Sequence, residues 1–375
     1  MTNNMTNTKR IEWFDAFRGF AMILIVFTHV ELFGLMIPTS QSNIHYLVAQ
    51  LNTLLFFFMS GFMAYKSQNI IDRKLYGENV MKKIKMLLIP TLFFGLIYAY
   101  TRDSSSDLSV LEVVSAFFSE YRKVGYWFTF VLLEMFIVYY TALFFTRKLR
   151  KRNQCIILIS LALLLFLLSL IYPLNTHTAN YFSLELLCRN FQFFIFGSLC
   201  ACYKDRFFKL IDNPYFTGII LILFAVVYFI SLHWAALFNA CHLPHPSMLF
   251  DTTFLLVKTV IKYLGALIFV SIFKHYSQFF TTSHVGRGLQ YIGRRTLDIY
   301  LIHYFLLPRH IPQIGMYIIK TDSLVIETSI ALLIVLIVIL FSIIVSNIIR
   351  TSPFLAHYLL GVKWNRSKPH KNIGV

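Results

Sequence analysis

The sequence is poor in charged residues. Only 14% of its 375 residues are Asp, Glu, Lys or Arg, whereas a soluble domain carries about 25%. Hydrophobic residues make up 57% of the chain, and the runs 156–171 and 330–346 contain almost no polar side chain. An apolar helix of roughly 20 residues crosses a bilayer core of about 30 Å. The composition excludes an ordinary soluble domain and indicates an all-α polytopic membrane protein.

Cysteine is also scarce, with five residues in the chain, and no pair has C-x-x-C spacing. Cys200 and Cys202 are separated by a single residue, which is closer than the usual spacing of zinc ligands. Cys241, His242 and His245 stand close together in sequence, but the chain offers no other close Cys/His cluster to complete four ligands. We therefore predict that the protein needs no metal.

Acidic residues are half as frequent as basic ones, 17 against 34, which gives a net charge of +17. In a soluble protein such an excess would suggest nucleic acid. Here the cations crowd the connectors between apolar blocks, so we predict the lipid bilayer as a partner and no nucleic acid. The ten blocks cover residues 17–36, 45–65, 84–101, 126–145, 155–172, 184–203, 215–233, 252–273, 290–308 and 328–349.

The connectors alternate between basic and non-basic. Lys9 and Arg10 precede the first block, whereas the connector after it contains no Lys or Arg. The connector after the fourth block is the strongly basic 147–152, and the one after the fifth again has neither residue. The positive-inside rule therefore predicts that both termini are cytoplasmic, which agrees with ten membrane spans.

The chain shows no internal repeat and no Gly/Ser-rich linker, which indicates one transmembrane domain over 1–350 and a basic cytoplasmic tail over 351–375. The first ten residues lack the features of a secretory signal, so we expect the first helix to remain in the mature protein. In the outer segment 102–124, apolar residues recur at helical spacing at Val110, Val113, Val114 and Phe117. This pattern predicts a short amphipathic helix at the membrane surface.

Two polar residues stand out in the first block. Arg18 and His29 are eleven residues apart, which is about 16 Å along a helix and roughly three turns, so both side chains share one face. Asp15, three residues before Arg18, can pair with it. An ionisable group deep in a membrane usually faces a polar cavity, so we expect this face to line a polar cleft. The alternative is that Arg18 is an interface anchor and His29 a core histidine.

These residues also resemble a known family. The stretch "FDAFRGFAMILIVFTH" resembles the Arg-x10-His signature of the acyltransferase 3 family, where a D-x-x-RG turn precedes the helix. Five further segments, in the order of the family, are similar to its other motifs: "LLFFFMSGFMAYK", "MKKIKMLLIP", "GYWFTFVLLEMF", "FQFFIFGSL" and "YIGRRTLDIYLIHYFLLP". The segment "MKKIKMLLIP" has Lys where many members have Arg. The resemblance extends over residues 11–310.

The resemblance implies an integral membrane O-acyltransferase that moves acetyl from cytoplasmic acetyl-CoA to a hydroxyl of a cell-envelope glycan or lipid-linked sugar. It also implies a bacterial-type cytoplasmic (inner) membrane. Because CoA is polyanionic, a basic patch should hold it, and Arg18, Lys82, Lys83 and Lys85 supply one. His29 would act as the general base or would carry the acetyl group itself as an acyl-imidazole; both options stay open.

Several further polar or aromatic residues are weaker candidates. Glu134 lies inside an apolar block, and we predict that it orients His29 or His303 or pairs with a structural cation. Trp127, Tyr300 and His303 are candidates for the acceptor path, although packing explains aromatic residues equally well. Arg189 could contact a sugar, or form a structural i,i+4 pair with Glu185.

A transporter of a glycan precursor or small molecule is the alternative function. Ten helices with basic cytoplasmic connectors would suit one, but transporters often show repeats or broken helices in corresponding halves. The sequence shows neither. It specifies neither the acceptor, the acyl chain length nor the oligomeric state.

Overall fold

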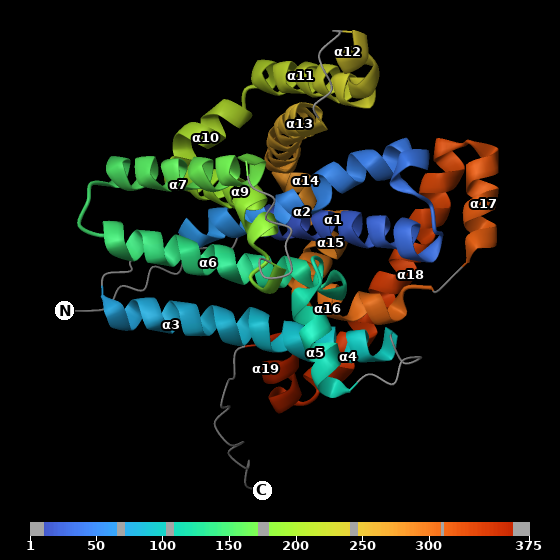
Figure 1. The fold of residues 1–375 in the computed structure, drawn as a ribbon, viewed down its shortest axis with the longest axis horizontal. Coiled ribbons are helices and arrows are strands. Elements are labelled where there is room, and N and C mark those ends of the chain that lie inside the picture. The colour runs from blue at the N-terminus through green and yellow to red at the C-terminus, as the bar shows by residue number, and fades with distance from the viewer. Residues whose placement is uncertain are drawn as a thin grey trace, which may run out of the picture. The chain divides into compact units, whose positions relative to one another are not determined.

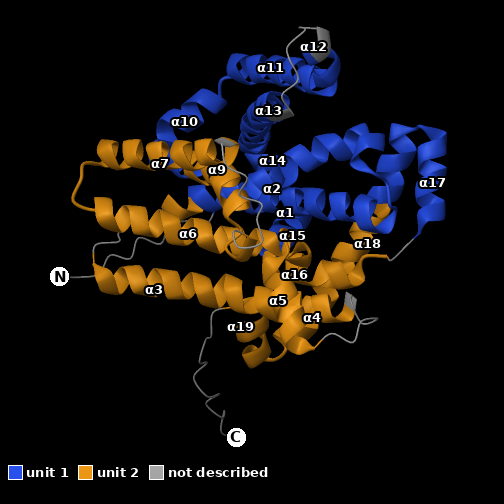
Figure 2. Ribbon diagram, viewed as in Figure 1, with its two compact units in different colours: residues 1–62, 197–296, 310–332 blue, residues 63–196, 297–309, 333–375 orange. Residues whose placement is uncertain are grey.

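The computed structural model describes residues 11–65, 72–102, 109–171, 180–240, 247–308 and 311–362 (Figure 1). All regular secondary structure in these ranges is helical, as the composition predicts. The chain divides into two compact units (Figure 2), each of which is described separately below.

Unit 1 comprises residues 1–62, 197–296 and 310–332. Its elements are α1 (Glu12–His29), the π-helix η1 (Val30–Gly34), the 3-10 helix η2 (Thr39–Gln41), most of α2 (Asn43–Ala64), the end of α9 (Leu184–Cys202), α10 (Lys204–Ile211), α11 (Pro214–Leu232), α12 (Trp234–Ala240), α13 (Ser247–His275), α14 (Ser277–Thr282), α15 (His284–Arg294), α17 (Pro312–Thr321) and the start of α18 (Leu324–Arg350).

Unit 2 comprises residues 63–196, 297–309 and 333–375. Its elements are α3 (Arg73–Lys83), the π-helix η4 (Ile84–Leu88), α4 (Ile89–Arg102), α5 (Val110–Ser119), the 3-10 helix η5 (Lys123–Gly125), α6 (Trp127–Thr146), α7 (Lys151–Ile171), most of α9, nearly all of α16 (Thr296–Leu306), the rest of α18 and α19 (Pro353–Leu360).

Eight helices in the described ranges are long and apolar enough to cross a membrane, or nine if the bent pair α9 and α10 forms one span. The bend between α9 and α10 is 97°. The predicted count of ten is not confirmed. The expected segment 290–308 falls on two helices of 11 residues each, α15 and α16, which are separated at Arg295. An 11-residue helix is only about 16 Å long, too short to cross the bilayer core.

The third span begins earlier than the sequence pattern predicts. Helix covers residues Arg73–Thr101, and the Asp72 side chain caps its start by accepting a hydrogen bond from the Leu75 amide at 2.7 Å. Pro90, which cannot donate to the carbonyl four residues earlier, follows the π-helix η4, as expected where the regular hydrogen-bond ladder is interrupted. Residues 73–83, which precede the predicted block 84–101, are therefore helical.

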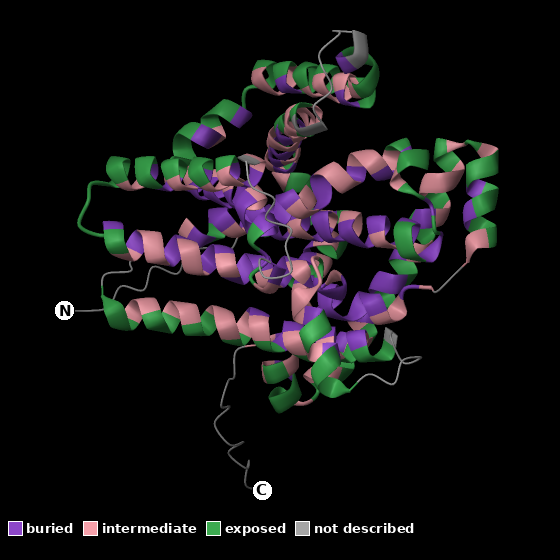
Figure 3. Cartoon of the chain, in the orientation of Figure 1, coloured by how far each residue is buried: buried purple, intermediate pink, exposed green. Residues whose placement is uncertain are grey.

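Burial separates inner helices from outer ones (Figure 3). In an apolar stretch of 18 residues in α2, 67% of the residues are buried, whereas in the corresponding stretch of α11 the share is 11%. The outward side chains of α11 are nevertheless large and apolar, such as Ile222 and Phe229. Apolar surface of this extent would be unfavourable in water and suits contact with lipid tails.

The predicted amphipathic helix is confirmed as α5. A capping box joins Ser109 and Glu112 at its start, and its buried residues are Val113 and Phe117, while Val110 is exposed. In the predicted tail, residues 353–360 form α19. Cys241, His242 and His245, which stand close together in sequence, lie outside the described residues.

Candidate functional site

Arg18 and His29 lie on one uninterrupted helix, α1, of which His29 is the last residue. The predicted separation of about 16 Å and the shared face therefore hold in this geometry. Both side chains are half-buried. The D-x-x-RG stretch is helical throughout, so the predicted turn is wrong.

Arg18 is fixed by neighbours within unit 1. One guanidinium nitrogen donates a hydrogen bond to Thr296 Oγ1 at 3.0 Å, and another lies 4.0 Å from the Asp15 carboxylate. The Arg18 side chain keeps 35% of its surface exposed. An arginine that is held by its neighbours and still accessible can bind an anion with little loss of conformational freedom.

Two glycines bring α1 and α15 into backbone contact beside Arg18. A Cβ on Gly19 would lie 2.0 Å from the Leu289 carbonyl oxygen, and one on Gly293 would lie 1.8 Å from the Asp15 carbonyl oxygen. No other residue permits such an approach, which is characteristic of close helix pairs in membranes. The glycine after Arg18 thus serves helix packing.

The face between Arg18 and His29 is apolar. Met22 and Ile25 occupy the same face, four and seven residues after Arg18, and are only 1% and 4% exposed. The face that Arg18 and His29 share therefore has polar groups at its two ends and buried apolar side chains between them, rather than the continuous polar lining that we predicted.

His29 lies nearer the far end of its span than the middle. The span covers Glu12–Gly34, and the π-helix η1 begins directly after His29. The ring centroids of His29 and Phe33 are 5.7 Å apart. Short π-helical segments often occur at functional sites, and here one follows the candidate catalytic imidazole.

The three candidate lysines lie in unit 2. Lys82 and Lys83 are in the last turn of α3 and Lys85 is in η4. Lys82 and Lys85 are exposed, whereas Lys83 Nζ lies 3.6 Å from the centroid of the Phe136 ring, a cation–π contact. Lys82 and Lys85 are therefore the more accessible pair for an anionic ligand.

Glu134 in α6 has a cation near it in unit 2. That cation is Lys123, which is fully buried. Lys123 Nζ donates to the Phe118 carbonyl at 2.6 Å and to the Asn180 carbonyl, while Glu134 Oε2 is buried without a hydrogen-bond partner. This arrangement favours pairing with a structural cation; orientation of a histidine by Glu134 stays a prediction.

Burial lowers the pKa of Lys123 to about 8, against the opposing effects of Glu134 and Glu120. The folded state therefore loses the Lys123 proton before the unfolded chain does, and folding stability from this residue rises between pH 8 and pH 10.5. We expect the unfolding midpoint of the wild type in detergent to gain a few degrees over Lys123→Met between pH 7 and pH 9.5. Parallel pH profiles of the two proteins would contradict this assignment.

The side chains of Tyr300 and His303 are held within unit 2 by contacts with backbone carbonyl groups. Tyr300 donates its hydroxyl hydrogen to the Gly125 carbonyl at 2.9 Å, and His303 is fully buried with Nδ1 2.8 Å from the Tyr300 carbonyl. Gly125 has a φ of +101°, which suits glycine. Trp127 is half-buried at the start of α6. These contacts favour structural roles for Tyr300 and His303.

Arg189 and Glu185 form the expected i,i+4 ion pair, with 2.7 Å between Nη1 and Oε1. Burial, followed by the charge of the Glu185 carboxylate, raises the pKa of Tyr121. Arg189 retains 38% exposure of its side chain, so contact with a sugar stays a prediction.

Unit 1 also contains a buried polar cluster that is not among the predicted site residues. Glu31 is fully buried and His45 is 3% exposed, and His45 Nδ1 lies 3.3 Å from Glu31 Oε2. The carboxyl group of Glu327 interacts electrostatically with that of Glu31. An acid two residues after His29 within an apolar span is a signal that could have identified this cluster. In the described ranges, no three His, Cys, Asp or Glu side chains gather as metal ligands would.

The helices and their lipid-facing surfaces define a multi-pass membrane protein. The family model described as an acyltransferase domain matches residues 11–351. The chain therefore belongs to the acyltransferase 3 family, and its activity is that of an acyltransferase. The predicted resemblance is confirmed and extends beyond residue 310. No curated protein and no solved structure matches the chain.

Proposed function

We propose that the protein is an O-acetyltransferase of a bacterial-type cytoplasmic membrane, which moves acetyl from cytoplasmic acetyl-CoA to a hydroxyl of a cell-envelope glycan or lipid-linked sugar. The observation that carries this proposal is the placement of Arg18 and His29 on one face of α1, in a chain of the acyltransferase 3 family. A fixed cation and a titratable imidazole about 16 Å apart suit the two ends of an extended thioester donor.

The donor would be held by its charge. Arg18 is accessible and already oriented by Thr296 and Asp15, so it can form charge-assisted hydrogen bonds to a CoA phosphate. Lys82 and Lys85 are exposed lysines of unit 2, and donor binding by them stays a prediction. The pantetheine arm would then extend along α1 toward His29. Because Met22 and Ile25 are buried between the two residues, entry of the arm requires these side chains to move.

His29 would perform the proton transfer. Its neutral imidazole takes the proton of the acceptor hydroxyl while the oxygen attacks the thioester carbonyl. The carbon–sulfur bond then breaks, the acetyl ester forms, and the proton leaves with the thiolate as free CoA. In the two-step alternative the imidazole first takes the acetyl group and then passes it to the hydroxyl.

Arg18→Ala should weaken binding of acetyl-CoA by about tenfold to a hundredfold, since a hydrogen bond to a charged group contributes roughly 1.5–3 kcal/mol. Calorimetry on the purified protein in detergent measures this directly. Thr296→Val is the matched control: it removes the hydrogen-bond acceptor of Arg18 but keeps the charge, and should have a smaller effect. Equal affinity of Arg18→Ala and wild type would refute donor binding by Arg18.

Release of free CoA from acetyl-CoA by the purified protein tests the activity. Release should depend on an added envelope glycan or lipid-linked sugar, and radiolabelled acetyl should appear on that acceptor. Mass spectrometry of glycans from cells with and without the gene should show the mass of one acetyl group as the difference. Transport of an acceptor without any acetyl transfer would instead support the transporter alternative.

A further inference from the structure

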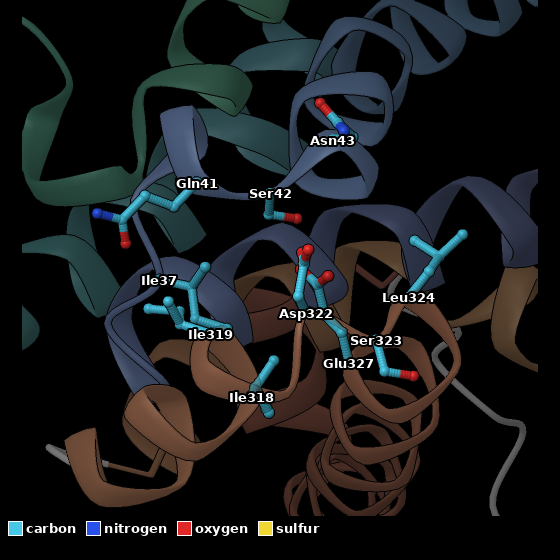
Figure 4. Close-up of a pocket in the computed structure, with 10 residues that line it drawn as sticks. All are labelled: Ile37, Gln41, Ser42, Asn43, Ile318, Ile319, Asp322, Ser323, Leu324 and Glu327. Carbon is cyan, nitrogen blue, oxygen red and sulfur yellow. The ribbon is translucent and has the colours of Figure 1, made fainter.

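A cavity of about 250 Å³ lies in unit 1 beyond the end of α1 (Figure 4). One wall comes from the segment between η1 and α2, and the other from the end of α17 and the start of α18. The cavity is small compared with ligand pockets of about 300–1,000 Å³. Its size suits one unit of a larger molecule rather than a whole cofactor.

Close packing holds the two walls together. A Cβ on Gly315 would lie 1.9 Å from the Leu35 carbonyl oxygen, so α17 contacts the chain directly after η1. The Ile311 amide donates to the Gly34 carbonyl at 3.2 Å. Residues far apart in sequence are thereby fixed beside each other, and the cavity does not depend on a loose loop.

The lining has a distinct chemistry. Four aliphatic side chains form part of it, and the other six lining residues are polar. None of the ten is cationic. Amides, hydroxyls and carboxylates recognise the hydroxyl groups of an uncharged polyol, whereas two acids disfavour an anionic ligand. The polar lining residues are Gln41, Ser42, Asn43, Asp322, Ser323 and Glu327.

Glu31, His45 and Glu327 form a polar network next to the cavity. Glu327 lines the cavity and interacts electrostatically with the buried Glu31 of the same unit. His45 lies against Glu31, and its own amide donates to Ser42 Oγ at 2.9 Å. The hydrogen bond from the His45 amide therefore fixes the position of Ser42 in the lining.

Part of this network lacks hydrogen-bond donors. Both carboxyl oxygens of Glu31 and Oε1 of Glu327 are buried and accept no hydrogen bond, and His45 Nδ1 has no well-aligned partner. Buried polar atoms are normally satisfied, and each exception calls for an explanation. A ligand hydroxyl in the cavity would provide the donor that Glu327 Oε1 lacks.

The position of the cavity fits the acceptor side of the proposed reaction. Ile37 in its lining comes eight residues after His29, beyond the end of the first span. The segment 37–45 has no Lys or Arg, so the positive-inside rule predicts that it faces away from the cytoplasm. The cavity thus lies at the end of α1 opposite to Arg18.

We propose that this cavity binds one neutral sugar unit of the acceptor, with Asp322 and Glu327 accepting hydrogen bonds from its hydroxyl groups. The proposal rests on the proposed function, because it assigns the acceptor site of the same reaction. It also commits to an uncharged polyhydroxylated ligand: a uronic acid should bind poorly beside the two carboxyl groups.

Saturation-transfer NMR on the detergent-solubilised full chain, without acetyl-CoA, tests the proposal. The probes are methyl glycosides of glucose, galactose and rhamnose, with methyl glucuronide as the anionic comparison. We expect saturation of at least one neutral glycoside and a several-fold weaker signal from the glucuronide. No binding of any neutral glycoside, or stronger binding of the glucuronide, would overturn the proposal.

Substitutions of lining residues test whether the saturation-transfer signal comes from a glycoside in this cavity. Asp322 has a φ of +45°, which Asn also tolerates, so Asp322→Asn removes the charge without straining the turn. Asp322→Asn and Gln41→Leu should each reduce the neutral signal at least threefold. Asp205→Asn, at an exposed acid of the same unit, should leave it unchanged. Equal signals in wild type and both cavity variants would place the sugar elsewhere and overturn the assignment.

Acetyl transfer measured in parallel separates the two proposals. If transfer to envelope glycans persists at the wild-type rate in both cavity variants, the transferase stands and this cavity is not its acceptor site. If neutral glycosides bind here but radiolabelled acetyl reaches no acceptor, the cavity assignment stands as a sugar site and the proposed function fails.

Discussion

His29→Ala is expected to reduce acetyl transfer by at least about 100-fold, since general base catalysis typically contributes 10²–10⁴-fold. The protein should still insert and fold, because His29 is half-buried at the end of α1 and the packing of α1 depends on the apolar residues and Gly19 before it. Acetyl-CoA affinity should change little, because Arg18 holds the donor phosphates in the proposed mechanism.

Transfer of radiolabelled acetyl to an envelope glycan measures the effect, and the thermal unfolding midpoint in detergent verifies folding. His233→Ala, which removes an exposed imidazole of the same unit, is the matched control and should retain full activity. Label retained on the wild type without acceptor, and absent from His29→Ala, would identify the acyl-imidazole route. Wild-type transfer by His29→Ala would exclude His29 from catalysis.

The sequence is sufficient to predict the apolar helices because membrane spans are marked by length and composition alone. The sequence predicts the ends of the helices less well where the backbone conformation of a single residue determines whether a helix continues. Residues 290–308 have the hydropathy of one span, yet α15 ends at Arg294 and Arg295 has a φ of −113° and a ψ of 13°. An average over a window of side chains cannot register a break at one residue.

The same contrast applies to the candidate site. Arg18 and His29 belong to one helix, so their relative placement follows from helix geometry and the number of residues between them. The cavity combines residues 37–43 with residues 318–327, and only tertiary packing through Gly315 brings these segments together. Hydropathy carries no information about that contact, so Asp322 and Glu327 could not be grouped with the first connector in advance.

Packing at glycine also underlies the second large effect that we expect. Gly293→Ala would place a Cβ 1.8 Å from the Asp15 carbonyl oxygen, where the obstacle is backbone and cannot rotate away. The helices α1 and α15 must therefore separate, and overpacking of this kind typically costs about 1–3 kcal/mol. Arg18 should lose its fixed position as well, because Thr296, its hydrogen-bond partner, follows Gly293 by three residues.

The expected result is an unfolding midpoint several degrees below that of the wild type, together with weaker acetyl-CoA binding. Gly288→Ala is the matched control on the same helix: a Cβ there meets nothing within 4 Å, so the change should be neutral or stabilise the helix by about 0.4–1 kcal/mol. Because both variants add one methyl group to α15, a difference between them isolates the contact with α1. Equal midpoints would show that α1 and α15 do not pack backbone to backbone, and the fixed placement of Arg18 would then lose its structural basis.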